Sequence, residues 1–113
     1  MEPLILQKKT EELLNKEVYP ILKKYPKSEK FALCQEIKQA FYRTLRNTML
    51  ANNIKRGRIH YLQQVDADLK LLLVLFSISR EQKYITERKC LQLQDKISEL
   101  GRITGGLMKA FVK

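Results

Sequence analysis

The stretch that decides the fold is residues 66–79, DADLKLLLVLFSIS. Within it, residues 69–78 contain one charged side chain, Lys70, and one hydroxyl, Ser77. This run is too short to span a bilayer, which takes about 20 apolar residues. It is also too apolar for a helix that keeps one whole face in water. We therefore expect it to form the central helix of a bundle.

Placed on a helix at about 100° per residue, the apolar residues around this stretch fall into two stripes. The first has the spacing of a core-facing helix and consists of Leu62, Val65, Leu69, Leu72, Leu73 and Phe76. The second lies on roughly the opposite side and consists of Leu71, Val74, Leu75 and Ile78. One stripe can pack into the chain's own core, whereas the second needs another partner. We expect the second stripe to contact another subunit of a homo-oligomer.

The chain has 113 residues, enough for one domain with one core over residues 1–113. A hydrophobic content of 44% with 30% charged residues is typical of a globular protein. Cys34 and Cys90 lack C-x-x-C spacing, which indicates neither a metal site nor a redox site and favours a reducing compartment. Because no signal-peptide pattern begins the chain, we expect a cytoplasmic protein without membrane contact.

Four helices follow from the apolar periodicity and from the breakers between them. They are expected over about residues 4–24, 28–51, 58–83 and 86–111. Pro20 predicts a kink in the first helix, and Ser28 and Thr86 are the predicted N-caps of the second and fourth. Short connections make sequential helices antiparallel, and no segment shows strand alternation. The predicted fold class is all-α, an antiparallel up-down-up-down four-helix bundle.

The other three helices each carry a core stripe as well. In the first helix it consists of Leu6, Thr10, Leu14, Val18, Ile21, Leu22 and Tyr25. In the second it consists of Cys34, Ile37, Phe41, Leu45, Thr48 and Met49. In the fourth it consists of Leu93, Ile97, Leu100, Thr104, Leu107 and Phe111. Since Cys34 stands on an apolar stripe, we interpret it as a small buried residue and not as a reactive thiol.

The net charge is +10, from 22 Lys and Arg residues against 12 Asp and Glu residues. So basic a small domain is expected to meet a polyanion, because each neutralised phosphate releases counterions. No acidic residue stands between Ile37 and Val65, where the basic ones are Lys38, Arg43, Arg46, Lys55, Arg56 and Arg58. Two interpretations stay open, a phosphate-facing patch for RNA or DNA and a solvated loop. Stacking on single-stranded bases is not strongly indicated, because few exposed aromatic residues accompany these cations.

Three glycines, Gly101, Gly105 and Gly106, stand inside the fourth predicted helix. Each costs about 1 kcal/mol relative to alanine in that position. Glycine lets another backbone approach closely, so we expect a tight helix–helix contact there. The glycines do not form a phosphate loop, because no strand precedes them and the G-x-x-x-x-G-K-[ST] spacing is absent.

The sequence does not show the side-chain groupings of an enzyme. The chain has one histidine, His60, and no spacing pairs it with a nucleophile or a second metal ligand. Small helical ribonucleases of the HEPN type place four to six residues between Arg and His, whereas Arg56 and His60 have three between them and Gly57 interrupts the helix. For Asp66 we expect an internal salt bridge to Arg102 or Arg58. We therefore predict a protein without catalysis, metal, cofactor or small-molecule substrate.

Residues 99–109, ELGRITGGLMK, resemble the E-I-G-R-x-x-G-G-[WL]-x-K ending of accessory variability determinant (Avd) proteins of diversity-generating retroelements. Residues 58–69, RIHYLQQVDADL, resemble the R-x-x-Y-L-x-x-A-D-x-x-L segment of that family. Residues 19–33, YPILKKYPKSEKFAL, resemble its Y-P-x-x-x-x-x-P-[KR]-x-x-[KR]-F-x-L segment. This last motif is shared with the four-helix proteins encoded in ribosomal RNA intervening sequences. A stand-alone helical RNA-binding or interaction protein of that kind is therefore the alternative.

The resemblance to Avd proteins implies a four-helix bundle that assembles into a basic, barrel-shaped homopentamer. It also implies binding to nucleic acid and to the element's reverse transcriptase during mutagenic copying of a template RNA, without catalysis. The residues that match family motif positions are Arg58, Asp66, Gly101, Arg102, Gly105, Gly106 and Lys109. We expect Arg102 and Lys109 to face the polyanion or the polymerase. Arg80 and Arg88 are further candidates, and Arg80 either lines an internal basic surface or caps the bundle.

Overall fold

The computed structural model describes residues 2–112, and side chains over residues 4–112. The predicted domain 1–113 includes Met1 and Lys113, which lie outside the described residues. The first helical column consists of α1 (Glu2–Leu13), the π-helical turn η1 (Leu14–Val18) and α2 (Tyr19–Leu22). It is followed by a 3₁₀ turn, η2 (Lys27–Glu29), and by the long helices α3 (Leu33–Asn53), α4 (Arg58–Glu81) and α5 (Glu87–Phe111).

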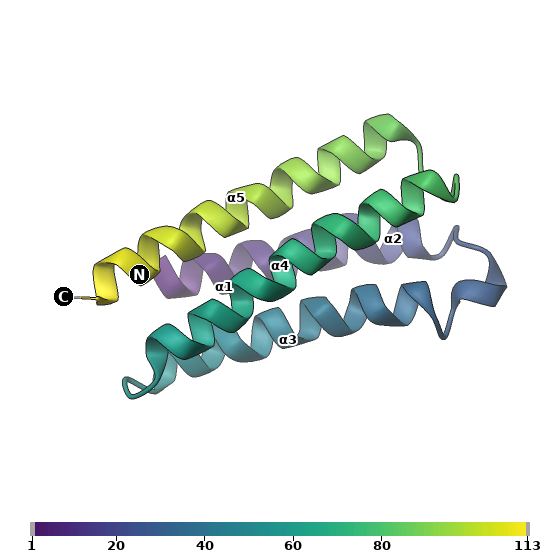
Figure 1. Cartoon of the computed structure of the whole chain (residues 1–113). Helices are drawn as coiled ribbons and strands as arrows, with labels where there is room; N and C mark the ends of the chain where they lie inside the picture. The colour runs from purple at the N-terminus through teal and green to yellow at the C-terminus, as the bar shows by residue number, and fades with distance from the viewer. Residues whose placement is uncertain (1, 113) are drawn as a thin grey trace.

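The four columns run up, down, up and down, which confirms the predicted all-helical four-helix architecture (Figure 1). Helix α4 packs beside both α3 and α5, and α1 packs against the same two helices from the other side. Helix α4 therefore lies diagonally opposite α1, and the two ends of the chain lie at the same end of the bundle (Figure 1). The molecule measures 45 × 24 × 20 Å. No strand occurs in residues 2–112.

The kink predicted at Pro20 takes the form of a π-helical turn. In a regular helix the proline ring would clash with the carbonyl of Lys16, and proline has no N–H to donate. The chain widens into η1 directly before the proline, and the Tyr19 N–H donates to the Leu14 carbonyl, five residues back. One extra residue in the turn lets the column continue as α2.

Helix α3 begins five residues later than Ser28, and the prediction of Ser28 as its N-cap is wrong. Residues 27–29 form the 3₁₀ turn instead. The carboxylate of Glu29 accepts a hydrogen bond from the Leu33 N–H at 3.3 Å and another from the Tyr84 hydroxyl at 2.8 Å. Because Tyr84 lies in the turn after α4, a distant contact stabilises the local conformation. The predicted cap of α5 is confirmed, since Thr86 Oγ1 accepts from the Lys89 N–H at 3.1 Å.

The core lies between the four columns and matches most of the predicted stripes. Its largest fully buried side chains include Phe41, Phe76, Ile37, Leu62, Leu72 and Leu93. On α3 the prediction needs correction, because Met49 is 46% exposed and Leu45 is half-buried, whereas Ala40, Thr44 and Ala51 are buried. Small side chains face the centre at these positions, and a helix whose inner side chains are small can approach its neighbours closely.

Buried hydroxyl groups are compatible with this core because most of them bond to their own helix. Thr10 donates to the Leu6 carbonyl at 2.7 Å, and Thr44 donates to the Ala40 carbonyl at 2.8 Å. Ser79 and Thr104 donate in the same way to the carbonyls four residues before them. These side chains therefore present a methyl group or a satisfied oxygen to the interior.

Candidate nucleic-acid interface

The turn between α3 and α4 exposes two cations. Helix α3 ends where the Ile54 N–H donates to the Leu50 carbonyl at 2.8 Å. Gly57 then adopts a left-handed conformation with φ of 77°, which residues with a side chain rarely adopt. Between these two positions the side chains of Lys55 and Arg56 are exposed and form no salt bridge within residues 4–112. This turn can therefore present two unneutralised charges to a polyanion.

Arg58 differs from its two predicted neighbours, because its guanidinium contacts the chain itself. Its Nε donates to the Ala51 carbonyl at 2.7 Å, at the C-terminal end of α3. The guanidinium carbon lies 4.4 Å from the centre of the Phe111 ring, near the end of α5. Arg58 therefore ties α3, α4 and α5 together through a hydrogen bond and a cation–π contact.

Two other predicted cations lie beside acidic groups. Arg43 donates to one carboxylate oxygen of Asp68 through Nε at 3.1 Å and Nη2 at 2.9 Å, which links α3 to α4. Arg80 is half-buried in the last turn of α4, where a positive charge is favourable, and its Nε lies 3.4 Å from the Glu81 carboxylate. The positive field of both residues is therefore partly cancelled by their own neighbours.

The salt bridge predicted for Asp66 has a different partner. Its carboxylate accepts from Lys70 Nζ at 2.9 Å, one turn along α4, and not from Arg102 or Arg58. Arg58 is held elsewhere, and a partner four residues away on the same helix is within direct reach. Arg102 is exposed on α5 and forms no salt bridge within residues 4–112.

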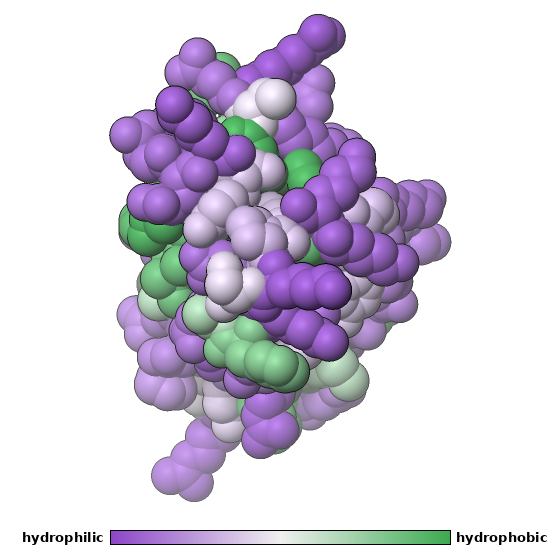
Figure 2. Space-filling model, turned by 90° about the vertical axis from the view of Figure 1, so that its right-hand side faces the viewer, coloured by the Kyte–Doolittle hydropathy of each residue, from purple (hydrophilic) through white to green (hydrophobic). Residues whose placement is uncertain are grey.

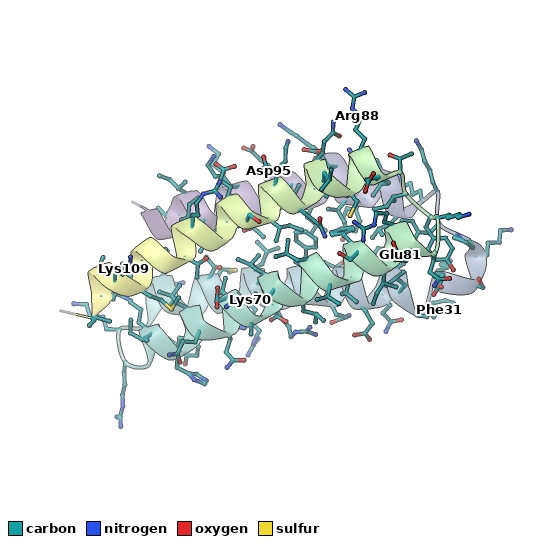
Figure 3. All side chains as sticks on the ribbon, turned by 45° about the horizontal axis from the view of Figure 1, so that its top comes forward. Phe31, Lys70, Glu81, Arg88, Asp95 and Lys109 are labelled. Carbon is teal, nitrogen blue, oxygen red and sulfur yellow. The ribbon has the colours of Figure 1, made fainter. Side chains whose placement is uncertain are left out.

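The predicted basic residues do not form one surface. Figure 3 shows Arg88 and Lys109 near opposite ends of α5, which places them about 30 Å apart at about 1.5 Å per residue. Arg102, Lys109 and the turn with Lys55 and Arg56 belong to the end of the bundle that carries the chain termini. Arg46 is exposed midway along α3, and Arg80 and Arg88 belong to the opposite end. The first group is the larger concentration of predicted cations.

The second apolar stripe of α4 is only partly on the outside. Val74 is 54% exposed and Ile78 is 42% exposed, and Leu71 is half-buried. Leu75 is only 8% exposed, so its placement on the outward stripe is wrong. Leu75 stands at the border of the core stripe, between Leu72 and Phe76 of that stripe in sequence, and it belongs to the buried core. Leu71, Val74 and Ile78, hereafter the outer face of α4, are the part of the second stripe that stays wholly or partly in solvent.

Within residues 4–112 the three glycines of α5 make no close contact, so the tight helix–helix contact predicted there does not form inside one chain. A Cβ atom added at Gly101, Gly105 or Gly106 would meet no heavy atom within 4 Å, apart from the helix's own backbone and adjoining residues. Gly101 lines a shallow groove between α4 and α5 together with Lys70 and Leu73. The structure of a single chain therefore gives no steric reason for glycine at these positions.

Both cysteines are buried and form no disulfide. Cys34 Sγ lies 3.8 Å from the Leu22 carbonyl and Cys90 Sγ lies 3.4 Å from the Phe76 carbonyl. Burial raises the pKa of each thiol above its ordinary value. The interpretation of Cys34 as a buried structural residue is therefore confirmed.

A second concentration of charge, of which the predicted basic patch includes only Lys38, lies at the end of the bundle away from the termini. Residues 23–38 contain five lysines, Lys23, Lys24, Lys27, Lys30 and Lys38, around the connection from α2 to α3. This lysine density was visible in the sequence. What the sequence did not show is that the fold brings Tyr19 against Lys38, with Nζ 5.2 Å from the ring centre.

The described side chains do not gather into a metal centre. Within residues 4–112, no group of three or more His, Cys, Asp or Glu side chains is placed to hold a metal ion. His60 is exposed on the first turn of α4. Among the described helices, none has both the length and the hydropathy needed to cross a bilayer.

The fold and its exposed cations define a small, basic helical-bundle protein. The sequence model of the bAvd-like family matches residues 4–111, and the chain belongs to this family. Its members are accessory proteins of the Avd type, a non-catalytic kind of protein connected with retroelements. No curated protein matched the chain, and no solved structure did.

Proposed function

We propose that this chain is the non-catalytic accessory subunit of a diversity-generating retroelement, and that it binds nucleic acid through phosphates while it associates with the element's reverse transcriptase. Membership of the bAvd-like family over residues 4–111 is the observation that carries this proposal. The net charge of +10 supports the nucleic-acid part, because a basic surface gains free energy from the counterions that phosphates release.

The main phosphate contacts are assigned to the cations near the chain termini, Lys55, Arg56, Arg102 and Lys109. All four are exposed and none forms a salt bridge within residues 4–112. Arg46, exposed on α3, adds a further contact along the bundle, whereas Arg88, at the opposite end, acts as a separate contact. Arg43 and Arg80 contribute less, because carboxylates already lie beside them. Arg58 acts through the fold, since it holds the turn that presents Lys55 and Arg56.

We also propose that the active form is a homo-oligomeric barrel, with the outer face of α4 as a subunit contact. Val74 and Ile78 leave apolar area in water on a helix whose other side is already buried. The spacing of Leu71, Val74 and Ile78, three and then four residues, is that of a seam between packed helices. In a basic assembly the cations of several copies would act together on one polyanion.

The test of nucleic-acid binding is a salt titration with a fluorescent RNA. The logarithm of the affinity should fall linearly with the logarithm of the salt concentration, by about 0.9 per phosphate contacted in a duplex and about 0.7 in a single strand. The double variant Lys55→Gln/Arg56→Gln should make this slope shallower by about 1 to 2. Binding that does not respond to salt, or no binding at low salt, would contradict the proposal.

The matched control removes two positive charges that already have acidic partners. Arg43→Gln/Lys70→Gln changes the net charge by the same amount, yet Asp68 and Asp66 partly neutralise these side chains in the native protein. It should change the slope less than Lys55→Gln/Arg56→Gln does. Co-purification with a reverse transcriptase encoded beside this gene tests the polymerase part separately. Location of the gene inside a ribosomal RNA intervening sequence would favour the stand-alone alternative.

A further inference from the structure

A cavity of about 260 Å³ lies between α2, the connection that follows it and the first turns of α3. Four cationic side chains line it, Lys23, Lys27, Lys30 and Lys38. They come from three separate parts of the chain, so the fold brings them together around one space. Figure 2 views this end of the molecule, where strongly hydrophilic side chains surround paler and apolar ones.

Among the side chains that the structure describes, no carboxylate lines this cavity. Glu29 is the acidic residue of the connection, and its two oxygens accept hydrogen bonds from the Leu33 N–H and from the Tyr84 hydroxyl. None of the four lysines forms a salt bridge within residues 4–112. Four like charges around one space repel each other, and an anion bound among them would relieve that repulsion.

The wall of the cavity is aromatic and apolar, unlike an ordinary lysine-rich surface. Tyr19 lines it, and the Tyr19 hydroxyl is hydrogen-bonded to the hydroxyl of Tyr42 on α3. Lys38 Nζ lies 5.2 Å from the centre of the Tyr19 ring. Leu22 and Cys34, both buried in the protomer, also contribute to the wall. A positioned tyrosine ring beside cations suits a ligand that has both a flat apolar part and a phosphate.

We infer that this cavity binds a nucleoside phosphate, with the base against Tyr19 and the phosphate groups among Lys23, Lys27, Lys30 and Lys38. The ligand is either a free nucleotide or one unpaired nucleotide of a single strand, which share this chemistry. The site is separate from the surface with Lys55 and Arg56, at the opposite end of the bundle (Figure 1). It goes beyond the proposed role, because it needs neither a polymerase nor an oligomer.

The first test measures binding of ATP and of tripolyphosphate by isothermal titration calorimetry. Wild-type protein should bind ATP more tightly than tripolyphosphate, because only ATP has a base. Lys27→Gln/Lys30→Gln should weaken ATP binding by about tenfold or more, since two charge-assisted contacts are lost. Lys8→Gln/Lys16→Gln, with the same change in net charge at exposed positions outside both proposed binding surfaces, should leave ATP binding unchanged. Both pairs are exposed, so neither double variant removes a core contact.

Three results would overturn the inference. They are no binding of ATP, equal affinity for ATP and tripolyphosphate, and equal loss of affinity in the two double variants. Displacement of a fluorescent oligo-deoxythymidine by ATP would assign the cavity to a nucleotide within a strand. Retention of the oligonucleotide, with ATP still bound, would assign the cavity to a free nucleotide. If Lys55→Gln/Arg56→Gln does not change RNA binding while Lys27→Gln/Lys30→Gln still weakens ATP binding, the result contradicts the proposed RNA surface and supports this site.

A second measurement does not depend on any variant. Limited acetylation of lysines in the native protein, followed by mass spectrometry, should show protection of the four cavity lysines by ATP. Lys8, exposed on α1 and outside both proposed binding surfaces, should be acetylated at the same rate with and without ATP. Uniform protection of all exposed lysines, or no protection, would show that ATP has no defined site here.

Discussion

Glu17 is the residue that carries most of the electrostatic contact between the first column and α5. It lies in the π-helical turn, and its carboxylate accepts from Lys96 Nζ and from Lys89 Nζ, the latter at 3.3 Å. The hydrogen bond from Lys96 lowers the pKa of Glu17, burial opposes that shift, and Lys89 adds to the lowering. The folded state therefore favours the ionised carboxylate more than the unfolded chain does.

Glu17→Gln should reduce the free energy of unfolding at neutral pH by about 1 kcal/mol, because two lysines lose a shared anionic partner. Since the folded pKa is lowered, this stabilisation is fully present above the unfolded pKa and is lost as the pH falls through the folded pKa. The stabilities of the two proteins in urea should therefore begin to converge below the ordinary glutamate pKa of about 4.3 and coincide only below the lowered folded pKa. Glu11→Gln, an exposed carboxylate on α1 without a salt bridge in residues 4–112, should cost little at any pH. A difference that persists in acid would contradict this assignment.

Individual residues were predictable from the sequence where their contacts are local. Thr86 caps the helix that starts beside it, and the N-cap preference for threonine needs only the next three residues. Ser28 also belongs to the residue types that favour the N-cap position. Its prediction failed because the neighbouring Glu29 accepts a hydrogen bond from Tyr84, 55 residues away, and residues 27–29 form a 3₁₀ turn. The sequence contains no sign of that pairing, because it arises only when the two connections meet at one end of the bundle.

Substitution of the glycines tests whether helix α5 contacts another chain. Each lies inside a helix and has open space where a Cβ would be. Gly106→Ala should raise the free energy of unfolding by about 0.5 to 1 kcal/mol, because alanine loses less backbone entropy in a helix. Gly101→Ala, on the groove beside α4, should do the same in a single chain. Destabilisation of either variant in urea denaturation would show that the glycine contacts something outside its own chain.

The phase of a helix was harder to predict than its existence. All four helical columns and the position of the kink follow from breakers and apolar spacing, which act within a few residues. On α3, however, apolar spacing favoured Leu45 and Met49, whereas the structure buries Ala40, Thr44 and Ala51. Hydropathy weights large side chains, while the contact between two helices also selects small ones that let the backbones approach. That choice depends on neighbouring helices and not on α3 alone.

For the whole molecule, the sequence predicts the fold of one chain better than the contacts between chains, because those contacts depend on surfaces outside the chain. Two stripes on α4 were predicted from its sequence, and the structure buries one and leaves Val74 and Ile78 of the other in water. Leu75 was assigned to the wrong side because it stands at the border of the core stripe, where a stripe analysis does not decide which side is buried. Which surface covers the outer face of α4 depends on other copies or partners, and the mass of the protein in solution tests the first of these.

Val74→Glu and Ile78→Glu should lower the mass of the protein in solution toward that of one 13.3 kDa chain. A charge placed in an apolar contact between subunits loses its hydration without gaining a partner, which costs several kcal/mol. Both side chains are exposed in the single chain, so the circular dichroism spectrum of the separated subunits should stay helical. Light scattering gives the mass, and Leu91→Glu, an apolar residue 57% exposed on α5, is the matched control that should keep the native mass. A Val74→Glu protein with unchanged mass would place the subunit contact elsewhere. Leu75→Glu differs from these variants and should fail to fold, because Leu75 belongs to the core.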